Sequence, residues 1–187
     1  MQSAKIILQL FGTIIAATIF LAGCSTISVN QDYDPGYDFS KLKTFGFIPI
    51  TEDSGIDQLN ATRLGDAIKA NLTAKGFTLS ENADFGIALF FSKQTKTNVQ
   101  SYGYGYGYGY GYGRYGGGYG GMGGVDVTQY DEGTLVIDFV DIAKQELFWR
   151  GIGTGALSET PSVEERTEKI NNAVTQILEQ FPPTKEE

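Results

Sequence analysis

Apolar and polar residues alternate along several short stretches of this chain, with the period of two that is typical of a strand with one buried face. In residues 43–50, for example, Phe45 and Phe47 alternate with Thr44 and Gly46. Further strands are predicted at residues 77–79, 84–97, 125–130, 134–142 and 147–157, with a short one near 27–33. Asp131-Glu132-Gly133 predicts a turn before the strand at 134–142, and residues 143–146 predict a second turn after it.

Two longer stretches repeat apolar residues with the period of an amphipathic helix. The first is residues 57–75, which stop at Gly76 and carry an apolar stripe made of Ala61, Leu64, Ile68 and Leu72. The second begins where Ser162 and Glu165 have the spacing of a capping box, and Pro182-Pro183 ends it. Its apolar face consists of Val163, Ile170, Val174, Ile177 and Phe181.

This order of elements predicts an α+β fold. Short gaps between strands favour antiparallel hairpins, and two amphipathic helices bury their stripes when they pack on a sheet. We therefore expect an antiparallel sheet of about four or five strands with two helices on one face. A single domain at residues 41–183 contains this sheet, a long Gly/Tyr loop is inserted between strands at residues 102–124, and residues 184–187 form a polar tail.

The amino terminus has the layout of a secretory signal: Lys5, an uncharged apolar run, then small residues. Leu21-Ala22-Gly23-Cys24 resembles a bacterial lipobox, so residues 1–23 are expected to be a signal peptide and Cys24 to carry a diacylglycerol and an acyl chain. Residues 24–40 would then be the acylated Cys and a tether. An uncleaved membrane helix is the alternative, because about 17 apolar residues are the low end of what spans a bilayer. Ser25 after the cysteine favours the outer membrane, with the protein facing the periplasm; exposure at the cell surface stays an open alternative.

Charge and composition narrow the chemistry. The formal net charge is −8, with 14 basic and 22 acidic residues, and an acidic surface repels nucleic acid. The chain has no histidine and one cysteine, which leaves no intramolecular disulfide, no Cys/His zinc site and no Ser-His-Asp arrangement. We expect no metal site and no cofactor beyond the covalent lipid on Cys24.

The segment 102–124 consists of 13 Gly, 8 Tyr, one Arg and one Met. In an extended chain, side chains two residues apart share a face, so the alternation predicts a flat aromatic strip. Its candidate binding residues are Tyr102, Tyr104, Tyr106, Tyr108, Tyr110, Tyr112 and Arg114. Such a strip is suited to stack on the sugar rings of envelope polysaccharide, on a partner's aromatic rings or on a copy of itself. The alternative is a flexible loop that repeat expansion has lengthened, since glycine resists ordering.

Several acidic residues near the predicted turns have both a functional and a structural interpretation. Asp138 and Arg150 are expected to face each other across a hairpin, as a cross-strand ion pair rather than a polar site. The pairs Asp138 with Asp141, and Asp131 with Glu132, have the spacing of no calcium loop, and we interpret them as solvated charges. Trp149 is expected in the core, where Gly151, Gly153 and Gly155 on its face of the strand leave room beside it.

Short motifs follow one another along the mature chain: Tyr37-Asp38-Phe39-Ser40, Lys43-Thr44-Phe45, Gly76-Phe77, Ala83-Asp84-Phe85, Gly133-Thr134-Leu135-Val136-Ile137-Asp138-Phe139, Trp149-Arg150-Gly151 and Phe181-Pro182-Pro183. Their order resembles the domain-of-unknown-function family 4136 over nearly all of the mature chain. The resemblance implies an envelope lipoprotein with a small α+β domain, and it carries over no reaction or catalytic residue.

We therefore expect a lipid-anchored cell-envelope protein with a non-enzymatic binding or structural role. Its partners would be the bilayer, through the acyl chains, and envelope polysaccharide or another copy of itself, through the Gly/Tyr insert. The alternative is a carboxylate-based hydrolase acting on envelope glycan, which needs two facing acids. A subunit of an assembly is a third possibility, and it would self-associate through the insert.

Overall fold

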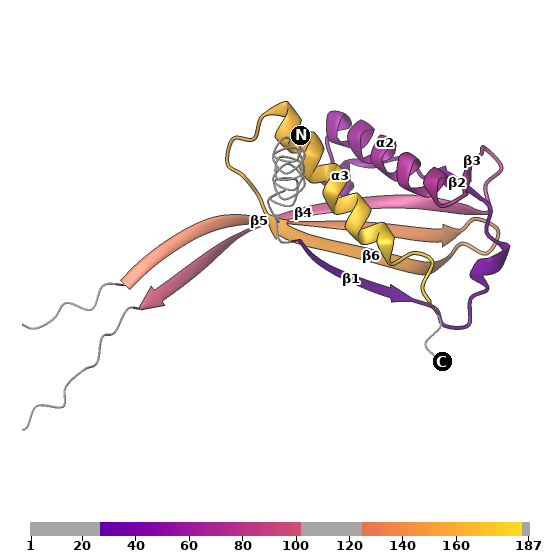
Figure 1. The fold of residues 1–187 in the computed structure, drawn as a ribbon, viewed down its shortest axis with the longest axis horizontal. Helices are drawn as coiled ribbons and strands as arrows, with labels where there is room; N and C mark the ends of the chain where they lie inside the picture. The colour runs from indigo at the N-terminus through magenta and orange to yellow at the C-terminus, as the bar shows by residue number, and fades with distance from the viewer. Residues whose placement is uncertain (1–26, 102–124, 185–187) are drawn as a thin grey trace, which may run out of the picture.

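The computed structural model describes residues 27–101 and 125–184. Two α-helices and a six-stranded sheet make up this part of the chain (Figure 1). In chain order the elements are β1 (Ser28–Tyr33), the 3-10 turn η1 (Phe39–Lys41), β2 (Thr44–Phe47), the 3-10 turn η2 (Glu52–Ser54), α2 (Gln58–Ala74), β3 (Thr78–Leu79), β4 (Phe85–Ser101), β5 (Val125–Asp141), β6 (Glu146–Ala156) and α3 (Val163–Glu179).

The sheet is mixed, which corrects the prediction of an antiparallel sheet of four or five strands. Its order is β1-β6-β5-β4-β2-β3. Strand β2 pairs in parallel with both β4 and β3, while the β4–β5, β5–β6 and β1–β6 pairs are antiparallel. The parallel β2–β3 pair follows from the chain order, because β3 follows β2 through the crossover helix α2.

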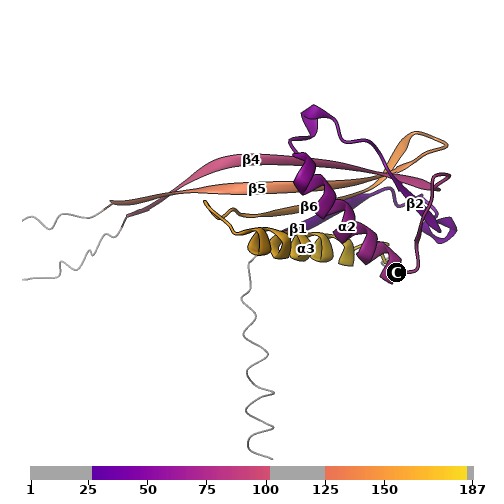
Figure 2. The same cartoon turned by 90° about the horizontal axis from the view of Figure 1, so that it is seen from above.

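Both helices lie on one face of the sheet (Figure 2). Alternate residues of the central strands point toward them, so that Leu135, Ile137 and Phe139 of β5 are buried. The helices contribute Leu64, Ala67, Ile68 and Leu72 from α2 and Val174, Ile177 and Leu178 from α3 to the same core. The apolar stripes predicted from the helical period are therefore the buried faces of α2 and α3.

Both helices begin at side-chain caps, and the capping box predicted for the second helix is confirmed. The Asp57 carboxylate accepts a hydrogen bond from the Asn60 amide at 2.9 Å and begins α2. At the start of α3, Ser162 and Glu165 form a complete capping box, with bonds of 2.8 and 3.1 Å. Within the part of the chain that the structure describes, neither helix is long and apolar enough to cross a membrane.

The predicted turn at Asp131-Glu132-Gly133 is wrong, because β5 runs without a break through these residues. Gly133 pairs with Lys93 of β4 and with Gly155 of β6. A Cβ atom on Gly133 would lie 2.9 Å from the side chains of Phe91 and Leu157. The glycine thus makes room for two apolar side chains inside a strand and does not mark a turn.

Glycines also let α3 approach β6 closely. A Cβ atom on Gly151 would lie 2.4 Å from Ile177 Cγ2 and 2.4 Å from Trp149 Cη2, and one on Gly153 would lie 2.7 Å from Ile177 Cδ1. Trp149 is fully buried, as predicted, and its indole N–H donates to Gln31 Oε1 at 3.0 Å. The room that the sequence pattern predicted beside Trp149 is therefore occupied in part by Ile177.

The chain enters the sheet soon after the predicted lipidation site. Within the predicted tether of residues 24–40, Ser28–Tyr33 form the edge strand β1. Ser28 pairs with Thr154, and Thr154 pairs with Thr134 of β5. Residues 25–27 are thus all that separates Cys24 from the first strand.

Candidate functional site

The lipidation and binding residues that the sequence predicts lie outside the residues that the structure describes. This applies to Cys24 and to the candidate strip of Tyr102, Tyr104, Tyr106, Tyr108, Tyr110, Tyr112 and Arg114. The described residues do show what lies next to each of these segments. The strands β4 and β5 flank the insert, and Ile27 is the first described residue after Cys24.

Strands β4 and β5 extend beyond the sheet as a two-stranded arm (Figure 1). Among the described residues, the last pair between β5 and β6 is Glu132↔Ala156. The β4–β5 pairing continues for seven further pairs, from Thr95↔Asp131 to Ser101↔Val125. We call residues 95–101 and 125–131 the arm; at about 3.4 Å per residue it is roughly 24 Å long.

The root of the arm is held by charged and polar side chains. Lys93 Nζ lies 2.7 Å from an Asp131 carboxylate oxygen, and the Thr95 hydroxyl donates to the other at 2.8 Å. Lys96 pairs with Glu132 at 3.4 Å. The bonds from Lys93 and then Thr95 lower the pKa of Asp131. Because all of these side chains are partly exposed, the pairs fix the register of the strands more than they add stability.

A groove of about 440 Å³ opens at the root of the arm, between α2, α3 and the sheet. Its apolar lining includes Leu64 of α2, Phe91 of β4, Leu135 of β5 and Ile170 of α3. Phe91 and Ile170 are only partly buried. Glycines of β5 and β6 form part of the wall, at positions 133, 153 and 155. Ile27 also lines the groove, so this hollow adjoins the segment that leads to Cys24.

Charged side chains also line the groove. Lys93, Arg166 and Lys169 line the groove together with Asp57, Asp131 and Glu159. Lys169 Nζ bonds to the Ser158 hydroxyl at 2.5 Å. The pKa of Asp57 is lowered, first by the bond from the Asn60 amide. An apolar floor with a charged rim suits an amphiphile, with its tail inside and its polar group at the mouth.

The sequence analysis did not identify this groove, because its lining comes from five separate segments of the chain. One signal was present: glycines on the inward face of a strand leave space beside a neighbouring side chain. At the opposite end of the sheet, large aromatic rings fill the corresponding space. The ring of Phe181 lies 4.6 Å from that of Phe139 and 5.2 Å from that of Trp149, between centroids.

The interpretation of the acidic residues as solvated charges is wrong for Asp138 and Asp141, which are buried and have structural partners. Asp138 receives two bonds from the Arg150 guanidinium, at 2.7 and 2.6 Å, which confirms the predicted cross-strand pair. The carboxylate has 7 % side-chain exposure, and this pairing raises the pKa of Arg150. Asp138 points away from the helices, whereas Asp141, an odd number of residues along β5, bonds to Tyr37 on the other face.

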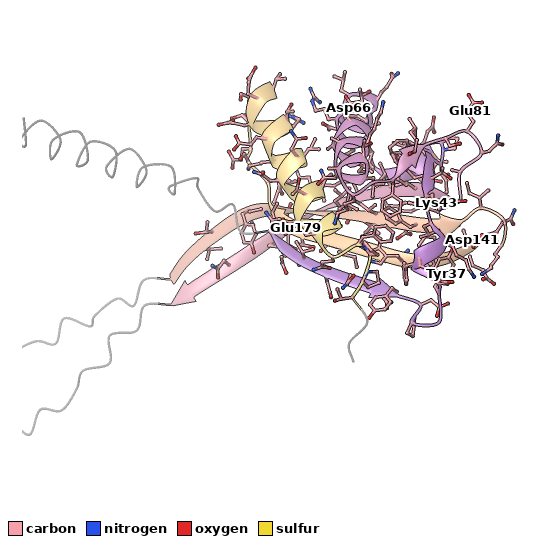
Figure 3. All side chains as sticks on the ribbon, turned by 45° about the vertical axis from the view of Figure 1, so that its right-hand side comes forward. Tyr37, Lys43, Asp66, Glu81, Asp141 and Glu179 are labelled. Atoms are coloured by element: carbon pink, nitrogen blue, oxygen red, sulfur yellow. The ribbon has the colours of Figure 1, made fainter. Side chains whose placement is uncertain are left out.

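Tyr37 and Asp141 lie side by side at the end of the sheet far from the arm (Figure 3). Their oxygen atoms are 2.9 Å apart, and the Tyr37 ring stacks on Phe148 at 4.2 Å. Burial first, and then the bond to Asp141, raises the pKa of Tyr37. The Lys144 amide is the first cause that lowers the pKa of Asp141. These groups therefore close the turn after β5 and form no pair of facing acids.

Among residues 27–101 and 125–184, no three His, Cys, Asp or Glu side chains gather in a way that could hold a metal ion. The chemistry of the groove is accordingly that of an apolar surface with charged edges. It offers burial and hydrogen bonds to a bound molecule.

Some solved structures are similar to this chain at low sequence identity. A PDZ domain protein from Parabacteroides distasonis is 16% identical, with a TM-score of 0.55, and the match covers 91% of this chain. The chain spans 40% of the length of that protein. The PelC dodecamer from Paraburkholderia phytofirmans is 12% identical with a TM-score of 0.44, covering 86% of this chain and 100% of that one. A putative neuraminyllactose-binding hemagglutinin homolog from Helicobacter pylori is 12% identical with a TM-score of 0.40, covering 76% and 87%.

Among curated protein sequences, none matches the chain. The sequence does match the profile of one family, described as a domain of unknown function, DUF4136, over residues 29–183. That range runs from β1 to the residues that follow α3, and it includes the arm and all of the groove lining except Ile27. The chain therefore belongs to the DUF4136 family.

Proposed function

We propose that this chain is a lipid-anchored cell-envelope protein with a non-enzymatic binding role, and that the arm presents the Gly/Tyr insert to its partner. The observation that carries the proposal is the continued β4–β5 pairing, seven residue pairs beyond the last partner in β6. A two-stranded ribbon without a third strand or a core contributes little to folding. Its retention is explained if it positions residues 102–124 away from the domain.

The anchor is part of the same proposal. The sequence Leu21-Ala22-Gly23-Cys24 places a lipidation site three residues before Ile27, and two or three acyl chains hold a protein firmly on a bilayer. Ser25 supports the outer membrane, with the domain in the periplasm. Cys24→Ala is expected to leave an uncut precursor without fatty acid, measured by gel mobility and fatty-acid labelling. Normal maturation of this variant would contradict the anchor.

The partner proposed for the insert is envelope polysaccharide, with another copy of the chain as the second choice. Tyrosine rings at alternate positions share one face of an extended chain, and flat aromatic faces suit sugar rings. The mature chain carries a formal charge of about −9, since Lys5 is removed from a total of −8. This charge disfavours polyanionic nucleic acid as the partner.

A carboxylate-based hydrolase gains less support. A general acid needs a raised pKa at neutral pH, whereas Asp57 and Asp131 in the groove have lowered pKa values because they accept hydrogen bonds. Asp57 also begins α2. A binding role is compatible with all of these contacts as they stand.

The test compares three variants with the wild-type lipidated protein, in sedimentation with purified cell-wall glycan. In the first variant, an Asn-Gly turn replaces residues 102–124 and joins the paired residues Ser101 and Val125. In the second, the six alternating tyrosines become serine, which keeps the length. In the third, they become phenylalanine. Loss of at least ten-fold in affinity, about 1.4 kcal/mol, is expected for the first two.

The phenylalanine variant is the matched control, because it keeps the aromatic faces and removes only the hydroxyl groups. Retained binding in this variant supports stacking, and its loss assigns the contact to the hydroxyl groups. Chemical cross-linking of the same forms measures self-association. If glycan binding and self-association are both unchanged in the turn and serine variants, the insert is no binding surface and the proposal fails.

A further inference from the structure

The groove at the root of the arm adjoins the segment that carries the proposed anchor. Ile27 lines the groove, and a Cβ atom on Gly153 would lie 3.7 Å from Ile27 Cγ2. Cys24 precedes Ile27 by three residues, a span of at most about 11 Å even in a fully extended chain. Any acyl chain attached to Cys24 therefore starts within reach of the mouth of the groove.

We infer that the groove receives one of the acyl chains on Cys24, an inference that rests on the proposed lipid anchor. The occupant is part of this chain, and its position is set by the short connection through residues 25–27. A lipidated cysteine of this kind carries up to three chains, and two are enough for stable anchoring. One chain can thus leave the bilayer without releasing the protein.

The chemistry of the groove matches such a chain. Phe91 and Ile170 present apolar surface that the domain itself leaves partly uncovered, and burial of each methylene against it is favourable. The volume of about 440 Å³ falls in the range of small-molecule sites, roughly 300–1,000 Å³. At the rim, Arg166 and Lys169 carry N–H donors that suit the ester and amide carbonyl oxygens next to the acyl chains.

Docking of this chain would fix how the domain lies on the membrane. The groove, the start of β1 and the root of the arm share one end of the sheet, because Ser28, Thr154 and Thr134 are in register. With the chain in the groove, this end faces the bilayer. The arm leaves the sheet from the same end, so it lies on the membrane side of the domain.

The experiment labels the full lipoprotein in cells with a fatty acid that carries a diazirine, followed by illumination and mass spectrometry. Adducts between the lipid on Cys24 and peptides that contain Leu64, Phe91 or Ile170 are the expected result. Label on Cys24 with adducts only to bilayer lipids or to other surfaces would overturn the groove while leaving the anchor intact. Absence of label on Cys24 would overturn the anchor and the occupant together.

Three variants on α3 sharpen the result. Ala173→Phe fills the groove from α3 and is expected to reduce the groove adducts at least five-fold. Asn172→Phe adds the same ring at the neighbouring exposed position, outside the groove lining, and is expected to leave them within two-fold. Ile170→Thr gives a second test that adds no bulk, with the same direction expected, should Ala173→Phe fail to fold. Equal adducts in all forms would overturn the inference.

A control experiment with added lipid distinguishes the chain's own lipid from the lipids of the bilayer. The mature sequence with Cys24→Ser, which has no acylation site, is mixed with vesicles that contain a diazirine-labelled phospholipid. Few adducts in the groove are expected. Adducts as abundant as those from the label on Cys24 would show that bilayer lipid fills the groove, and would overturn the inference that the occupant is the chain's own.

Discussion

The close contact between α3 and β6 predicts that alanine at Gly151 lowers the stability of the domain, whereas alanine at Gly65, away from this contact, raises it. A Cβ atom on Gly151 would lie 2.4 Å from both Ile177 Cγ2 and Trp149 Cη2. Each must retreat by about 1 Å to reach an ordinary contact of 3.4 Å. Ile177 and Trp149 are fully buried, and the bond to Gln31 holds the indole in place.

Gly151→Ala is therefore expected to cost about 1–3 kcal/mol, the usual range for overpacking a filled core. For a domain of roughly 150 residues this lowers the Tm by about 2–12 °C, at about 2–4 °C per kcal/mol. Gly65→Ala is the matched control. Gly65 lies inside α2, and a Cβ atom there would meet nothing within 4 Å. Alanine at this position is expected to stabilise by about 0.5–1 kcal/mol.

The assay is urea and thermal unfolding of the purified protein in mild detergent, followed by far-UV circular dichroism. The two variants should fall on opposite sides of the wild type. A Gly151→Ala variant as stable as the wild type would refute the close approach of α3 to β6. A destabilised Gly65→Ala variant would show that something contacts this position on α2.

Three further predictions use the same unfolding assay. Arg150→Met is expected to cost about 3 kcal/mol, because it leaves the buried Asp138 carboxylate unpaired, and Asp138→Asn should cost less, because Arg150 is 42 % exposed and can be hydrated; equal costs would contradict this asymmetry. Ser162→Ala removes half of the capping box and should cost about 1 kcal/mol, whereas an unchanged urea midpoint would show that the cap is dispensable. The amides of Lys43 and Thr44 lower the pKa of Asp84, so the contribution of Asp84 to the free energy of unfolding is present above its unfolded pKa of about 3.9 and is lost as the pH falls below that value. Asp84→Asn should therefore reduce the loss of stability at acidic pH. An unchanged dependence of stability on pH would contradict the assignment.

The helices could be predicted from the sequence because their signals are local. The stop at Gly76, the Ser162 capping box and the apolar period all act within one or two turns of helix. The Asp138–Arg150 pair was also predictable, since a short hairpin fixes which residues face each other. In each case the residues that interact are close in the sequence or are joined by one turn.

The remaining features depend on contacts between distant segments. The mixed sheet was missed although strand, helix and strand follow one another from β2 to β3, an order that favours a parallel pair. Gly133 was assigned to a turn because its role depends on Phe91, across the sheet, and on Leu157. The groove forms only where α2, α3 and three strands come together, and the pattern of apolar residues within a single element cannot predict it.

The position of β1 has a mechanical consequence. Its six residues are the edge of the sheet, and the chain enters at Ser28, the end from which the arm leaves. A pull between the membrane anchor and a partner on the arm would act across the strands, so the β1–β6 hydrogen bonds would open one after another rather than resist together. Such an edge yields at low force. If the proposed anchor at Cys24 exists, the domain holds the arm beside its attachment point and is poorly suited to carry tension between that anchor and a partner on the arm.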